Sequence, residues 1–268
     1  MEINRIYNCD CLTGLQALED ESIDMVITSP PYDELRDYDG YVFTHYYFLE
    51  VVKELYRVLK KGGVVIWVVN DQTKKHSESG TSFKQALAFK ELGFCIYDTM
   101  IYAKNNPAPL NHERYEQCFE YMFVFSKGKI KTFNPIKEKC KYYGKHRDGT
   151  RRQDVSGKLK RINKPGIVGE EKIKGNIWYY NVGKAQTNDN IAYKHEAIFP
   201  EQLVKDHLVS WSNENDLVLD IFMGSGTVAK VSLENNRSFI GFEVSRKKCC
   251  EANSRLERLN RQTSLFDI

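Results

Sequence analysis

The sequence lacks any apolar run that approaches the length of a membrane-spanning helix. Its first residues, Met1-Glu2-Ile3-Asn4-Arg5, do not have the pattern of a signal peptide. The seven cysteines are an odd number and form no paired C-x-x-C motifs with zinc-site spacing. We therefore expect a cytoplasmic protein with reduced thiols, without a metal site and without membrane contact.

The chain as a whole also has no large excess of positive or negative charge, because its net charge is only +3. The charge is unevenly spread, however. Between residues 127 and 174 the sequence holds 16 Lys and Arg but 5 Asp and Glu, a local balance of +11 that leaves −8 for the remainder. This asymmetry predicts a polyanionic partner for one region and not a generally basic protein.

The length of 268 residues suits one α/β domain with an insertion and a sizeable core. Hydrophobic patterns predict strands at residues 6–10, 23–27, 64–69, 94–103, 119–125, 217–221 and 239–243. They predict helices at 12–18, 43–60, 82–92, 227–235 and 245–259, and one that starts at Pro200. Such alternation indicates an α/β sandwich around a mostly parallel sheet.

Three local features complete this prediction. Gly62-Gly63 is expected to end the helix over 43–60. The strands at 94–103 and 119–125 are expected to form a hairpin at the sheet edge, and the apolar island 177–180 to anchor the basic insertion to the main domain.

A chemically suggestive stretch follows the apolar run 23–27, where the chain reads Ser29-Pro30-Pro31-Tyr32. The prolines have no N–H, so their carbonyls stay free to accept hydrogen bonds from a ligand. Together with the Ser29 hydroxyl and the Tyr32 ring, they suit a planar base with an exocyclic amino group. The alternative is a proline turn that ends a strand, with Tyr32 as ordinary packing.

A second stretch has the pattern of a nucleotide site. The strand at 217–221 leads into a loop with Gly224 and Gly226, whose small size allows close backbone approach to a ligand. The next strand ends in Glu243, 19 residues after Gly224, which approximates the spacing of an acidic residue that binds ribose hydroxyls. The loop is not the dinucleotide pattern G-x-G-x-x-G.

Together, the two motifs resemble those of the amino-methylating DNA methyltransferases, site-specific enzymes that act on cytosine N4 or adenine N6. Ser29-Pro30-Pro31-Tyr32 resembles the catalytic motif, and the segment from Leu217 to Thr227 resembles the S-adenosylmethionine loop. The catalytic motif comes first in the chain, as in the β class of this family. The resemblance extends from about Asn4 to Leu259, apart from a middle segment.

This resemblance implies a Rossmann-like, S-adenosylmethionine-dependent methyltransferase sandwich of the α/β class, with circularly permuted motif order and an inserted target-recognition region. Residues 1–126 would form the catalytic half, 127–184 the insertion and 185–268 the cofactor-binding half. S-adenosyl-L-methionine is the implied cofactor, and double-stranded DNA with a flipped-out base is the implied partner. A cognate restriction endonuclease and a homodimer are left open.

The resemblance also assigns residues. The Ser29 hydroxyl and the Pro30 carbonyl would hold the amino group, Tyr32 would stack on the base, and Pro31 completes the catalytic motif. The implied cofactor-binding residues are Asp10, Phe199, Asp220, Phe222, Gly224, Ser225, Gly226, Thr227 and Glu243, although Asp10 serves equally well as a helix cap. The implied DNA-binding residues are Arg151, Arg152, Lys158, Lys160 and Arg161, against the alternative of a solvated basic loop.

The expected reaction is methyl transfer to N4 of cytosine, because family members with Ser before Pro-Pro-Tyr are mostly cytosine-N4 enzymes. The same reaction on N6 of adenine is the alternative, since both bases present an amino group beside a ring nitrogen. A catalytically inactive DNA-binding protein and an RNA or protein N-methyltransferase are less favoured. The intact motifs argue against the first, and the motif order and basic insertion against the second.

Overall fold

The computed structural model describes residues 1–31, 43–107, 114–182 and 199–264. The chain divides into two compact units, one made of Met1–Asn134 with Asn176–Ile268 and the other of Pro135–Gly175. The second unit lies within the predicted insertion over 127–184. Its role in target recognition stays a prediction.

An eight-stranded sheet forms the centre of the first unit. In spatial order its strands are β1 (Arg5–Tyr7), β16 (Ser238–Phe242), β15 (Leu217–Asp220), β2 (Ile23–Thr28), β3 (Leu59–Val69), β7 (Phe119–Ser126), β6 (Cys95–Lys104) and β14 (Ile177–Tyr180). Strand β7 pairs antiparallel with both of its neighbours, whereas every other pairing is parallel. The predicted mostly parallel sheet is therefore confirmed.

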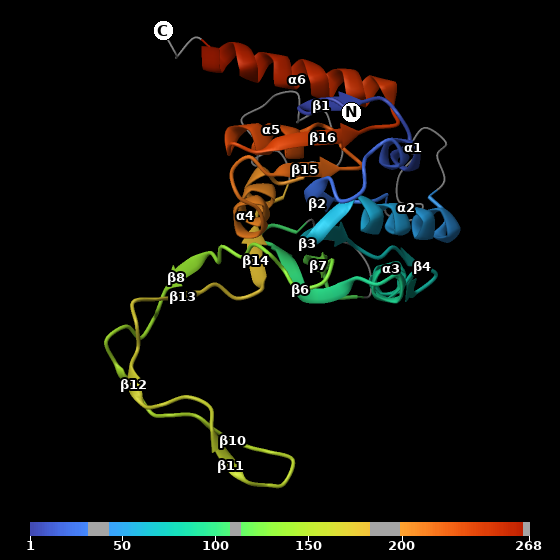
Figure 1. The fold of residues 1–268 in the computed structure, drawn as a ribbon. Coiled ribbons are helices and arrows are strands. Elements are labelled where there is room, and N and C mark those ends of the chain that lie inside the picture. Colours follow the sequence, from blue (N-terminus) through green and yellow to red (C-terminus); the bar gives the residue numbers. More distant parts are fainter. Residues whose placement is uncertain (32–42, 108–113, 183–198, 265–268) are drawn as a thin grey trace. The chain divides into compact units, whose positions relative to one another are not determined.

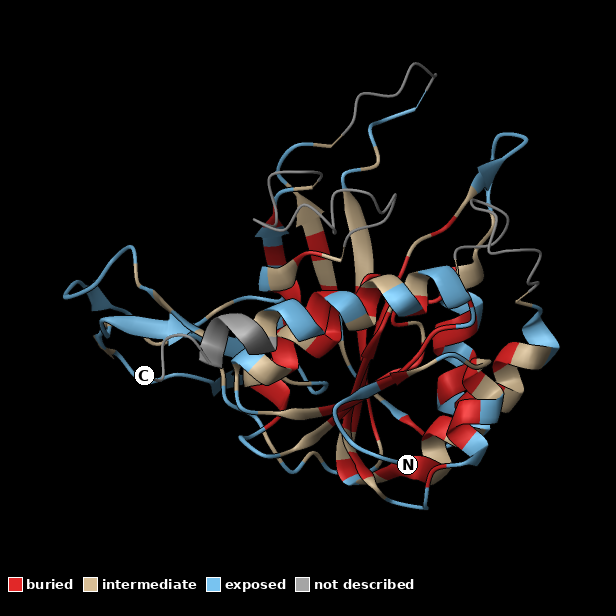
Figure 2. Ribbon diagram, turned by 90° about the horizontal axis from the view of Figure 1, so that it is seen from above, coloured by how far each residue is buried: buried red, intermediate tan, exposed pale blue. Residues whose placement is uncertain are grey.

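Helices cover both faces of the sheet (Figure 1). One face carries α1 (Cys11–Gln16), α2 (His45–Val58) and α3 (Thr81–Glu91), and the other carries α4 (Glu201–Trp211) and α5 (Thr227–Glu234), with α6 (Arg246–Ser264) beside β1. Figure 2 shows the buried residues concentrated in the strands and on the helix sides that face them. Because both faces are covered, β2 and the second half of β3 are almost continuously apolar, as expected of central parallel strands. Within the described ranges, no helix has both the length and the apolar content needed to cross a bilayer.

The prediction that Gly62-Gly63 ends a helix was wrong. Helix α2 ends at Val58, because Leu59 already adopts an extended conformation and starts β3. The two glycines lie inside β3, where its pairing with β2 shifts register. Gly62 has a φ of +81°, and a side chain at Gly63 would come within 2.7 Å of the Asp24 carbonyl oxygen. The glycine pair therefore permits an irregularity in the strand.

The hairpin of β6 and β7 is confirmed, but its predicted place at the sheet edge was wrong. Strand β14 pairs with β6 and forms that edge. The Tyr180 hydroxyl donates to Asp206 Oδ2 at 2.7 Å, and the Trp178 ring lies 4.8 Å from the His207 ring. The apolar island 177–180 thus anchors the chain to α4 directly after the second unit.

The second unit is a two-stranded antiparallel ribbon. It contains three nested strand pairs, β8 (Lys137–Lys139) with β13 (Glu171–Ile173), β9 (His146–Arg147) with β12 (Gly166–Ile167), and β10 (Arg151–Gln153) with β11 (Leu159–Arg161). Most of its residues are exposed, and none is buried. One further small hairpin, β4 (Thr73–Lys74) with β5 (Ser77–Glu78), lies in the polar loop after β3 of the first unit.

Candidate active site

The two sequence motifs meet at the carboxyl edge of the sheet. Strands β2 and β15 are parallel neighbours, with Val218 opposite Met25 and Leu219 opposite Val26. Their carboxyl ends therefore lie side by side, although the motifs stand far apart in the chain. In open α/β sheets this edge is where ligands bind.

A buried hydrogen bond joins the two strand ends. The Thr28 hydroxyl donates to Asp220 Oδ1 at 2.7 Å, and the same oxygen accepts from the backbone N–H of Phe222 at 3.0 Å. Both side chains are almost fully buried. Burial raises the pKa of Asp220 to about 7, against the lowering effect of these two hydrogen bonds. Asp220 therefore orients the start of the loop after β15 and holds it against the end of β2.

The glycine loop between β15 and α5 is tied to the end of β16. Gly224 and Gly226 have φ values of +51° and +78°, which favour glycine. The N–H of Gly224 donates to Glu243 Oε2 at 2.8 Å, and the N–H of Ser245 donates to Oε1 at 2.9 Å. Glu243 is 8% exposed, and each carboxylate oxygen can accept a second hydrogen bond. Such acceptors, fixed beside a tight glycine loop, fit the hydroxyls of a ribose.

A buried arginine on α6 forms hydrogen bonds with the loop between β15 and α5. Arg255 on α6 is 1% exposed and donates to the Ser225 carbonyl at 3.0 Å and to Thr227 Oγ1 at 3.2 Å. It also pairs with Glu201 at 2.7 Å, and Glu201 pairs with Lys230 at 2.6 Å. The network joins α4, α5 and α6 to the predicted cofactor loop. The sequence shows Arg255 only as one cation of a basic helix, so this role was not predicted.

The remaining predicted cofactor residues lie at several places around this edge. Asp10 caps α1 by accepting from the N–H groups of Leu12 and Thr13, which is the alternative to cofactor contact, and it also accepts from the Tyr47 hydroxyl. The Phe222 ring packs edge-to-face on Phe43, at 5.4 Å between centroids. Phe199 is half-buried just before α4.

The predicted catalytic residues follow β2 directly. Pro30 is buried, whereas Ser29 and Pro31 are half-buried. Tyr32 lies outside the described residues. The five predicted DNA-binding residues lie in the second unit. Arg151, Arg152, Lys158, Lys160 and Arg161 are all exposed on the ribbon of the second unit.

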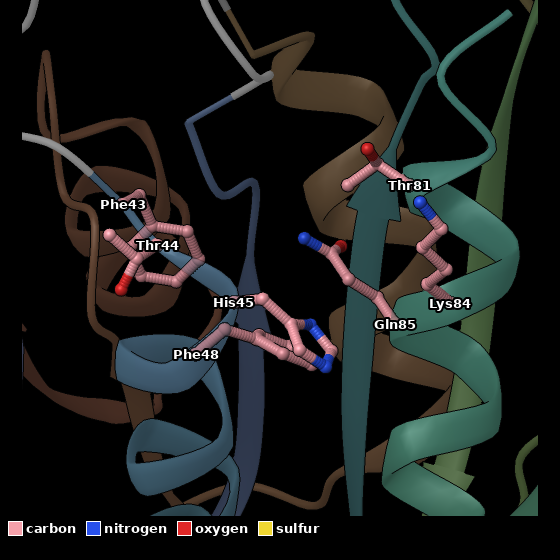
Figure 3. Close-up of a pocket in the computed structure, with 7 residues that line it drawn as sticks. All are labelled: Phe43, Thr44, His45, Phe48, Thr81, Lys84 and Gln85. Atoms are coloured by element: carbon pink, nitrogen blue, oxygen red, sulfur yellow. The ribbon is translucent and has the colours of Figure 1, made fainter.

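A cavity of about 430 Å³ opens between the N-terminal turns of α2 and α3 (Figure 3). Its described lining consists of Phe43, Thr44, His45, Phe48, Thr81, Lys84 and Gln85. Trp67 Nε1, which can only donate, bonds to Gln85 Oε1 at 2.8 Å and so fixes the orientation of the amide. Figure 3 shows the Gln85 amide nitrogen turned into the cavity. None of these lining residues was predicted, because the helical pattern indicates only which side of a helix is buried.

A second feature that the sequence analysis missed lies after β3. The buried Asp71 carboxylate accepts from the N–H of Ser82 and from the Ser79 hydroxyl, both at 3.0 Å. It supplies the side-chain cap that Gly80, at the start of α3, cannot provide. Asn70 Oδ1 accepts from Gln117 at 2.8 Å. The polar loop over 70–80 is thereby held against the carboxyl edge.

Comparison with known proteins decides the family. A family model for N6/N4 DNA methylases matches residues 23–254. The chain belongs to this DNA methylase family. It is accordingly an S-adenosylmethionine-dependent methyltransferase that acts on DNA. The match spans both motifs and the ribbon between them.

Individual relatives support the assignment. The chain is 52% identical to the orphan methyltransferase M.BamHII of Bacillus amyloliquefaciens over 242 residues, which cover 89% of this chain and 90% of the relative. The cytosine-N4-specific PvuII DNA methyltransferase has the same fold, with a TM-score of 0.69, 21% identity and coverage of 92% and 84% of the two chains. The complex of M1.HpyAVI with S-adenosylmethionine gives a TM-score of 0.57 at 23% identity, covering 94% and 98%.

The buried arginine gives the first prediction. Arg255→Leu should lower the free energy of unfolding by about 3 kcal/mol, because the partly buried carboxylate of Glu201 loses its ion pair with this buried cation. Urea unfolding measures this change. Arg258→Leu, at an exposed position on the same helix, is the matched control. Equal stability of the two variants would contradict a supporting role for Arg255.

The Asp220 carboxyl gives a pH-dependent prediction. Its pKa is about 7 in the folded protein against an ordinary value of 3.8 for an aspartate, so the folded state binds the proton more tightly. The resulting stabilisation is complete below about pH 4 and is lost as the pH rises through 7. The stability of the wild type relative to Asp220→Asn should therefore fall between pH 4 and 7 in urea unfolding. A constant difference over this range would show that Asp220 is ionised throughout.

Proposed function

We propose that this DNA methylase transfers a methyl group from S-adenosylmethionine to N4 of cytosine, at a specific sequence in duplex DNA. The observation that carries the proposal is the position of Ser29 and Pro30, directly after β2 and beside the loop that follows β15. The buried hydrogen bond between Thr28 and Asp220 holds the end of β2 against the end of β15. A methyl acceptor held by Ser29 would therefore lie next to the cofactor loop.

The chain's own groups position the base. The target amine is shielded by stacking in the duplex, so the base must leave the helix to reach Ser29. The Ser29 hydroxyl and the Pro30 carbonyl accept hydrogen bonds from the exocyclic amino group and orient its lone pair. Tyr32, which lies outside the described residues, stacks on the base. When the amino group and the methyl group are aligned in this way, their positioning accounts for much of the rate enhancement of the displacement.

The cofactor residues hold the other reactant. Glu243 accepts hydrogen bonds from the ribose hydroxyls, while the backbone around Gly224 and Gly226 approaches the ligand closely. Asp220 fixes the loop, and Arg255 supports it through Ser225 and Thr227. Bound S-adenosylmethionine supplies an electrophilic methyl group on a sulfonium.

The choice of base rests on Ser29. A serine hydroxyl both accepts from an amino group and donates elsewhere, whereas an aspartate only accepts. Serine at this position is associated with cytosine-N4 enzymes, and the PvuII enzyme of the same fold is cytosine-N4-specific. Adenine remains the second candidate, because its N6 amino group also lies beside a ring-nitrogen acceptor that the hydroxyl can serve.

Nucleoside mass spectrometry tests the base. DNA modified by the purified protein and S-adenosylmethionine should contain N4-methylcytosine. Ser29→Ala should reduce the modification and leave cofactor affinity unchanged, because the hydroxyl holds only the base. N6-methyladenine without N4-methylcytosine would overturn the cytosine assignment and leave the roles of Ser29 and Pro30 intact.

Titration calorimetry tests the cofactor site. Glu243→Ala should weaken S-adenosylmethionine binding by on the order of 1–3 kcal/mol, because the ribose hydroxyls and the Gly224 N–H lose their acceptor. Glu257→Ala, at an exposed position on α6, is the control and should bind as the wild type does. Unchanged affinity of Glu243→Ala would remove this residue from the site.

A further inference from the structure

The outermost part of the ribbon has a fixed register. Asp154 and Lys158 are joined by a backbone hydrogen bond, and Val155-Ser156-Gly157 forms the turn between them, with Gly157 at a φ of +79°. The Asp154 carboxylate accepts from the backbone N–H groups of Ser156 and Lys158. A three-residue turn with glycine in the left-handed conformation is a common hairpin connection. Local contacts therefore set which residues face each other in β10 and β11.

This register sorts the side chains onto two faces. Arg151 pairs with Arg161, Arg152 with Lys160, and Gln153 with Leu159. Successive side chains in a strand point to opposite faces, whereas directly paired residues share one. The first face, here called the reading face, consists of Arg151, Gln153, Leu159 and Arg161. The opposite face consists of Arg152, Asp154, Lys158 and Lys160.

The two faces differ in chemistry. The opposite face carries a carboxylate, and Lys160 lies 3.4 Å from Asp154 in an ion pair. The reading face has no acidic residue. Its Arg151, Gln153 and Arg161 are exposed, and none of their side chains forms a hydrogen bond or ion pair with a residue that the structure describes. Leu159 is 61% exposed beside them. Two guanidinium groups, an amide and an apolar side chain thus stand together in solvent.

These side-chain types match the base edges of DNA. The major groove admits a two-stranded ribbon, and its width is about 12 Å. Arginine recognises guanine through two acceptors, glutamine recognises adenine, and an apolar side chain contacts the thymine methyl group. We propose that the ribbon enters the major groove with Arg151, Gln153, Leu159 and Arg161 towards the bases, while Arg152 and Lys160 contact phosphates. This rests on the proposed methylation of duplex DNA at a specific sequence.

Strand geometry makes the proposal specific. Residues rise about 3.4 Å each along an antiparallel strand, and stacked bases on one strand are about 3.4 Å apart. Arg151 and Gln153 are therefore separated by about two base-pair steps in a ribbon that follows the groove. Arg161 faces Arg151 across the ribbon and contacts the same base pair as Arg151 or its neighbour.

A library of duplexes tests these assignments. The recognition sequence of the full-length wild type is first read from the positions it methylates in random DNA. Methylation rates are then measured on every single-base variant of that site. Arg151→Ala, Gln153→Ala and Arg161→Ala should each lose discrimination, by roughly 5- to 150-fold, at one or two base positions. The positions for Arg151 and Gln153 should lie two apart.

Arg152→Ala and Lys160→Ala are the matched controls on the opposite face. They should weaken binding to all duplexes equally and reduce the slope of log K against log salt by about 0.9 for each lost phosphate contact. Their base preferences should equal those of the wild type. Circular dichroism and cofactor affinity confirm that every variant keeps its fold.

Two results would overturn the proposal. One is a uniform loss of binding in the variants of the reading face, with base preference unchanged. The other is altered base preference in Arg152→Ala or Lys160→Ala alone. If adenine proves to be the methylated base, the proposed function is contradicted but the role of the reading face is not. The test of the reading face compares methylation rates at the flanking base positions and not at the modified base.

Discussion

The hydrogen bond from Thr28 to Asp220 is the interaction on which the site depends. It joins two neighbouring parallel strands at the point where both end, and it lies in a part of the core that water does not reach. Because Asp220 Oδ1 also accepts from Phe222, the start of the glycine loop is fixed relative to Ser29. The residues proposed to bind the base and the cofactor are distant in the chain, and this interaction holds them next to each other at the carboxyl edge of the sheet.

Much of this arrangement could be predicted from the sequence. The β-branched run before Ser29 and the glycines after Asp220 mark strand ends, and parallel strands bring such ends to one edge. The position of Glu243 follows from the strand–loop–helix–strand spacing. These features share a local signature, in which a change of residue type marks the point where an element stops.

Other parts of the site have no such signature. Arg255 lies in a helix whose many charged residues suggest a solvated surface, and only the packing of three helices reveals that it is buried. Gln85 is likewise an ordinary polar residue of α3 until Trp67 fixes its amide. Gly62-Gly63 was misread because glycines after a helical pattern usually indicate its end, whereas here they allow β3 to approach Asp24. In the second unit, the paired strands escaped prediction because both faces are exposed and mostly polar, so no regular alternation of apolar residues marks them.

The nested ribbon has a consequence for how such a protein changes over generations. In a paired strand, the gain or loss of one residue turns every following side chain to the other side. Because the turn after Asp154 sets the register, a single-codon deletion of Gln153 would put Arg152 in its place on the reading face and turn Arg151 to the opposite face. The sheet that carries Thr28 and Asp220 would be untouched. Under the proposed reading of DNA by this ribbon, a new target preference would therefore need one mutational step and no change in the strands that carry Thr28 and Asp220.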